Sequence, residues 1–104
     1  MRAEAYAREM TDRDDRCAVV EAACRKLEID HHTITRHASG HDWSVVTGRG
    51  LYNVEVNPDA LIRAVHVERS GYTDRKDWHL GEPAAGVVAD MVDFMVNGLL
   101  KPDA

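Results

Sequence analysis

Histidine is the residue type whose spacing first suggests chemistry in this chain. Four of the six histidines fall within one short stretch, positions 31–41. Imidazole is the commonest protein ligand of transition metals, and a hairpin here would bring His32 or His37 near His41. The spacing matches no zinc motif, however, and solvated histidines on an edge strand explain it without a metal. We therefore expect no metal and no cofactor, and keep His32, His37 and His41 as an alternative ligand set.

Candidate nucleophiles and bases do not form a recognisable catalytic motif. Ser44, His41 and Asp42 are close in sequence, but neighbours on a strand point to opposite faces and cannot converge as a triad does. Glu55 and His66 could face each other across two strands as an acid/base pair, for which a structural cross-strand pair is the simpler explanation. We expect no catalytic residues, and hence a protein that is not an enzyme.

Arginine is the residue type that would contact nucleic acid. The formal net charge of −5 lacks the basic footprint expected of a DNA-binding domain, because phosphate neutralisation supplies most non-specific affinity. A dimer could still gather several arginines on one face. The candidate nucleic-acid-binding residues are Arg36, Arg49, Arg63 and Arg69.

The N-terminal region has the apolar spacing of a helix. Apolar side chains recur at steps of three and four residues, which places them on one helix face, with Arg13 as a polar break. We expect a helix from about residue 12 to 28, with an extension back to residue 3. Cys17 and Cys24 lie too far apart on such a helix for a disulfide, and reduced thiols fit a cytoplasmic protein. Neither a signal peptide nor a membrane span is expected, since no apolar run has the required length.

The central region reads as strands joined by short turns. Strict alternation over Leu51–Asn57 predicts the clearest strand, and we expect others at 43–47 and 61–68 with a short edge strand at 31–37. Residues 69–82 are interpreted as a polar connection that Tyr72 and Trp78 anchor to the body of the protein.

The C-terminal region predicts a second helix, over Ala84–Leu100. Its apolar residues spread beyond one stripe, which indicates a second partner such as another subunit. The candidate partner or dimer-interface residues are Val87, Met91, Phe94, Met95 and Trp78.

The fold class that follows is α+β in one domain, residues 1–104. It has an N-terminal helix, a three- to four-stranded antiparallel meander and a C-terminal helix packed on the sheet. Such a sheet keeps one face or edge open, and forming a homodimer would cover it.

Two segments resemble the YbaB/EbfC family of small bacterial nucleoid-associated proteins. Residues 48–57 (GRGLYNVEVN) are similar to its glycine-rich turn and alternating-valine strand, and residues 62–67 (IRAVHV) to its following strand. Residues 3–28 and 84–100 look like its first and last helices. The resemblance implies a homodimer without catalytic residues that binds DNA or a protein. Since actinobacterial relatives of this fold accompany type VII secretion, the resemblance also implies a secretion-linked role.

Three functional hypotheses follow. The first is a non-enzymatic homodimer that binds DNA if the four arginines gather, and otherwise binds a protein. The second is an accessory chaperone or secretion-associated module that covers an apolar segment of its partner with the open sheet or the C-terminal helix. The third is a metal-binding protein that uses the histidines. None of them involves a membrane.

Overall fold

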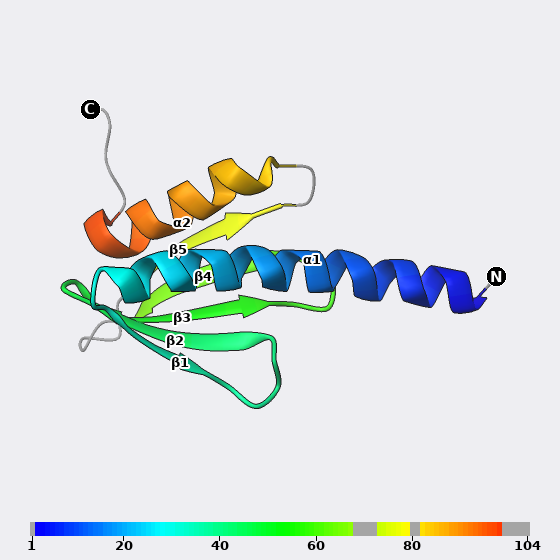
Figure 1. Ribbon diagram of the computed structural model, residues 1–104, viewed down its shortest axis with the longest axis horizontal. Helices are drawn as coiled ribbons and strands as arrows, with labels where there is room; N and C mark the ends of the chain where they lie inside the picture. Colours follow the sequence, from blue (N-terminus) through cyan, green and yellow to red (C-terminus); the bar gives the residue numbers. More distant parts are fainter. Residues whose placement is uncertain (1, 68–72, 80–81, 99–104) are drawn as a thin grey trace.

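The chain forms two helices and five strands in the computed structural model. The structure describes residues 2–67, 73–79 and 82–98, with side chains for 13–67, 75–79 and 82–98. The elements are α1 (Arg2–Ile29), β1 (Thr33–Arg36), β2 (Asp42–Thr47), β3 (Gly50–Val56), β4 (Ile62–Val67), β5 (Thr73–Trp78) and α2 (Ala84–Asn97) (Figure 1). This arrangement is the predicted α+β fold.

The strands form one antiparallel meander in the order β1-β2-β3-β4-β5. The strand count exceeds the predicted three or four because β5 lies inside the stretch 69–82 that was interpreted as a connection. Its sequence, TDRKDW, shows no apolar alternation, and charged side chains of this kind are common on an edge strand. Trp78 anchors this stretch as predicted and is 1% exposed, whereas Tyr72 lies outside the described residues.

The core lies between one face of the sheet and the two helices. Helices α1 and α2 lie over the same face of the sheet (Figure 1), and their buried side chains pack against alternate residues of the inner strands. The strand side chains in this core include Trp43, Val45, Tyr52, Val54, Val56, Ile62 and Ala64. The opposite face of the sheet is not covered by any element of the described chain.

Helix α1 is one continuous helix, and the predicted extension toward residue 3 is confirmed. The polar break Arg13 has a structural role, because its guanidinium donates to the carbonyl of Val56 at 2.8 and 3.1 Å. One turn on, the buried Arg16 donates to the carbonyls of Trp78 and His79. These two arginines tie α1 to the ends of β3 and β5.

Each helix also carries one carboxylate that bonds both a tryptophan and a cationic side chain of the sheet. Trp43 of β2 donates its indole N–H to Glu21 of α1 at 2.7 Å, and Arg36 of β1 bonds the same carboxylate at 3.0 Å. Trp78 of β5 donates to Asp90 of α2 at 2.8 Å, and Lys76 pairs with Asp90 at the same distance. Both indole N–H groups are thereby satisfied, as buried tryptophans require.

The predicted C-terminal helix is present as α2, and it ends at Asn97 rather than Leu100 because Gly98 leaves the helix with φ of 83°. Among the described residues, neither helix is long and apolar enough to cross a membrane.

Candidate interaction surface

The uncovered face of the sheet carries an apolar row that crosses three strands. Val46 of β2 pairs with Leu51 of β3, and Leu51 pairs with Val67 of β4. Their exposures are 46%, 39% and 39%, although each is a large apolar side chain. We call these three residues the apolar row. Aligned exposed side chains of this kind are typical of a surface that contacts another molecule.

A charged row crosses the same face nearer the other end of the strands. Asp42 pairs with Glu55, Glu55 pairs with Arg63, and Arg63 pairs with Asp77, so the row spans β2 to β5. The Arg63 guanidinium turns to Asp77, with Nε 3.0 Å from a carboxylate oxygen. This hydrogen bond holds the pKa of Asp77 below its ordinary value. Asp42 and Glu55 are like charges on paired residues, an arrangement that costs energy in an isolated sheet.

A hollow of about 530 Å³ lies on this face beside the charged row. Residues of β2 to β4 and of the turn after β1 line it, among them His37, Ser39, Asp42, Asn53, Glu55 and Arg63. We call this uncovered face of the sheet, with its apolar row, its charged row and the hollow, the open face. Its combination of apolar and charged side chains suits the binding of a polypeptide better than that of a purely apolar ligand.

His37 and Ser44 form a serine–histidine pair that sequence reasoning missed. His37 Nε2 and Ser44 Oγ are 2.8 Å apart and share a hydrogen bond on the exposed surface. The other ring nitrogen of His37 has no partner in the described part of the chain. A serine nucleophile needs a base that a third group orients, and this pair lacks that group. Glu55 and His66 do not form the other acid/base pair, since they lie on opposite faces of the sheet.

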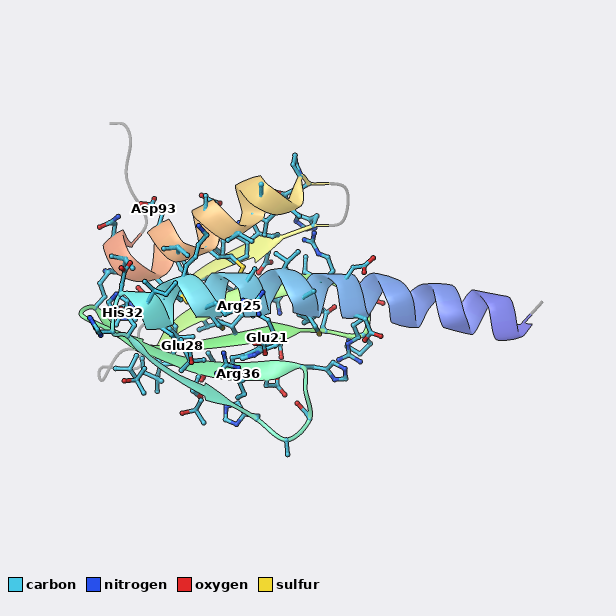
Figure 2. All side chains as sticks on the ribbon, in the orientation of Figure 1. Glu21, Arg25, Glu28, His32, Arg36 and Asp93 are labelled. Atoms are coloured by element: carbon cyan, nitrogen blue, oxygen red, sulfur yellow. The ribbon has the colours of Figure 1, made fainter. Side chains whose placement is uncertain are left out.

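The histidines do not converge. His32 precedes β1 at the end of α1 (Figure 2), whereas His37 follows β1 at the other end of that strand. Among the described residues, no group of three or more His, Cys, Asp or Glu side chains lies close enough to hold a metal. The alternative ligand set His32, His37 and His41 therefore has no support in the geometry.

The candidate nucleic-acid-binding arginines lie in separate places within the chain. Arg36 faces α1, where it bonds Glu21 once and Glu28 twice, at 3.0–3.1 Å (Figure 2). The bond from Arg36 lowers the pKa of Glu28. Arg63 lies on the open face in its pair with Asp77. Arg69 lies outside the described residues.

The remaining candidate, Arg49, lies at the C-terminal end of α2. It donates to the hydroxyl of Tyr52, and its guanidinium lies against Gly98, just after the last residue of the helix. A cation there interacts favourably with the helix dipole. A gathering of Arg36, Arg49 and Arg63 does not occur within one chain, so DNA binding by these residues stays a prediction.

The predicted partner interface on the last helix is wrong. Val87, Met91, Phe94, Met95 and Trp78 are each at most 2% exposed within the single chain. The wide apolar surface of α2 is used internally, because the helix packs on both the sheet and α1. A signal for the exposed apolar row was present in the sequence, because Leu51 and Val67 are large apolar residues at positions out of phase with the buried ones.

Comparisons with known proteins found no match: no family model, no curated protein and no solved structure matches the chain. The resemblance to the YbaB/EbfC family therefore gains no support and stays a prediction.

Proposed function

We propose that this chain is a non-enzymatic protein-interaction module that binds a polypeptide on its open face. The observation that carries the proposal is the apolar row. Of the four large apolar side chains that are exposed in the described residues, three form this row and the fourth is Ile29. The residues on the solvent-facing side of an antiparallel sheet are normally polar, so an aligned apolar row there indicates a contact surface.

The charged groups favour a protein partner over DNA. The open face presents the carboxylates of Asp42, Glu55 and Asp77 beside the guanidinium groups of Arg63 and Arg75, which lie 3.0 and 4.0 Å from Asp77. Carboxylates repel phosphate, and the whole chain carries a net charge of −5. This mode of action corresponds to an accessory chaperone or a secretion-associated module, which would cover an apolar segment of its partner.

Selection of peptides against the intact chain tests this proposal. Random peptides displayed on phage would be selected on the immobilised protein, and their affinities measured by calorimetry. The Leu51→Lys variant places a charge in the middle of the apolar row and should weaken the selected peptides by roughly tenfold or more, as expected for a central interface residue. Ile29→Lys is the matched control, because Ile29 is an exposed apolar residue outside the sheet.

Peptides that bind wild type and Leu51→Lys equally well would overturn the proposal, as would a selection that enriches nothing. A mixed-sequence DNA duplex at low salt serves as the comparison ligand. DNA binding that weakens steeply with salt, in place of peptide binding, would favour the nucleic-acid hypothesis instead.

A further inference from the structure

We infer that the polypeptide bound by the open face is a second copy of this chain, packed face to face about a two-fold axis that runs along β3. This inference rests on the proposed function of the open face and names its partner. It follows from the order of the rows on that face, which makes the surface complementary to itself in one direction.

A two-fold axis between two facing sheets can run along the strands or across them. An axis across the strands would place the apolar row of one copy on the charged row of the other, which buries charges against apolar groups. An axis along the strands places each row on its own counterpart. Both arrangements are closed dimers that use the same patch on each subunit. Only the second places apolar groups on apolar groups and charged groups on charged groups, so it is the favourable one.

Placing the axis along β3, the central strand, covers all five strands and sets β2 of one copy over β4 of the other. In the apolar row, Leu51 then meets its own copy and Val46 meets Val67 of the second copy. In the charged row, Asp42 meets Arg63 of the second copy. Because of the two-fold symmetry, this ion pair between Asp42 and Arg63 forms twice. Facing sheets lie about 10 Å apart, a gap that side chains from both sheets fill.

One residue opposes the arrangement. Glu55 lies on β3 in the charged row, so it faces its own copy across the axis. The hollow beside it leaves room for water between the two carboxylates. Their repulsion nevertheless weakens the dimer, and removal of this charge should tighten it.

The size of the surface sets the strength of the association. Five strands about 4.8 Å apart and about 20 Å long cover roughly 500 Å² per copy, or roughly 1,000 Å² for the pair. This total lies at the lower limit of specific interfaces, which predicts a reversible dimer rather than a permanent one. Twisted sheets that pack face to face cross at about 30°, so the two-fold axis would lie at roughly half that angle to each β3 strand.

Sedimentation of the full chain over a wide concentration range tests the inference. The Asp42→Arg variant puts like charges opposite each other twice and should weaken the dimer by roughly tenfold or more. Within one chain the same variant places a cation opposite Glu55 and loses the hydrogen bond that Ser39 donates to Asp42 at 2.9 Å, so circular dichroism of the variant accompanies the sedimentation as a check on its fold. Glu55→Gln should tighten the dimer by roughly two- to fivefold.

A mixing experiment identifies the paired residues. Arg63→Glu alone should also dissociate the dimer. An equimolar mixture with Asp42→Arg should form a heterodimer, because one charge pair then joins the two substituted positions with reversed signs and the other is the native pair of Asp42 and Arg63. If Arg63→Glu does not fold after losing its bond to Asp77, the Asp42→Arg and Glu55→Gln measurements decide the question.

Wild type that stays monomeric at every concentration would overturn the inference, as would a dimer that Asp42→Arg leaves unchanged. Peptides that bind wild type but not Leu51→Lys would then still support the open face as a docking surface. If wild type is monomeric at every concentration and no peptide distinguishes it from Leu51→Lys, both proposals are overturned.

Discussion

His31 occupies a backbone position that normally belongs to glycine. It follows the end of α1 with φ of 71°, in the left-handed region. The N–H of His31 donates to the carbonyl of Glu28, and the N–H of His32 donates to that of Leu27. These two bonds form the Schellman motif that closes many helices, and glycine is its usual residue at this position. The side chain of His31 therefore costs conformational energy without adding to a metal site.

Replacement of His31 by glycine should stabilise the fold. Relief of the left-handed backbone, less the entropy that glycine adds to the unfolded chain, amounts to about 1 kcal/mol. Denaturant unfolding followed by circular dichroism measures this change. His32→Gly is the matched control, since His32 is not left-handed, and it should lower stability by about 0.5–1 kcal/mol. Equal effects of the two variants would contradict the strain at His31.

At the scale of the elements, shared carboxylates couple each helix to the sheet. Asp90 of α2 accepts from both Trp78 and Lys76 of β5. Burial alone would raise the pKa of Asp90, but the hydrogen bonds from Lys76 and Trp78 outweigh it and leave the pKa lowered. The ionised carboxylate is therefore more favourable in the folded chain than in the unfolded one.

The pH dependence of stability follows from this sign. A lowered pKa contributes stability that is fully present above the ordinary value of 3.8 and is lost as the pH falls through the folded value. Asp90→Asn keeps an acceptor for the indole and removes the charge, so it should flatten the loss of stability below about pH 4. Unfolding by urea at a series of pH values measures it. Asp93→Asn is the control, because Asp93 lies on the same helix and its partner among the described residues is the uncharged Asn97. Equal curves for the two variants would refute the role of Asp90.

The elements differ in how far the sequence could predict them. β3 alternates strictly because one of its faces is buried, so its position was predictable to within a residue. Trp78 is the only apolar residue of β5, and the charged remainder of its sequence is typical of an edge strand and of a loop alike. Residues 62–67 of β4 include apolar side chains on both faces, and only tertiary packing decides that Ile62 and Ala64 are buried while Val67 is exposed.

The candidate site was less predictable than the fold, because it depends on which carboxylate each cation meets. Arg36 bonds Glu21 and Glu28 of α1, and Arg63 bonds Asp77 of β5, across separations of 8 to 15 residues. Periodicity predicts faces and elements but carries no information on such pairings. The apolar row became visible only when the register of β2 to β4 aligned its members.

At the scale of the whole molecule, the core lies on one face of the sheet, and both helices are needed to bury its side chains. Val20 and Leu27 of α1 and Met91 and Met95 of α2 are all completely buried in one cluster. Release of either helix would expose that cluster to water. We therefore expect the helices and the sheet to unfold together, as small domains usually do.

Cys24 reports directly on this cooperativity. Its side chain is 1% exposed in the core, and burial raises the pKa of its thiol to about 12. The thiolate is the reactive form, so the folded chain should protect Cys24 from alkylation. In the Cys17→Ser variant, which isolates Cys24, labelling at pH 8 should be roughly a thousandfold or more slower than in the unfolded chain.

The labelling rate of Cys24 should rise with denaturant concentration with the same slope as global unfolding. His31→Gly should lower this rate by the factor that corresponds to the added free energy of unfolding. The half-buried Cys17, measured in a Cys24→Ala variant, is the control. It should react faster and with little dependence on denaturant, because its exposure needs no global opening. If Cys24 reacts as readily as Cys17 in the absence of denaturant, then α1 leaves the sheet by a local transition, and the fold is not one cooperative unit.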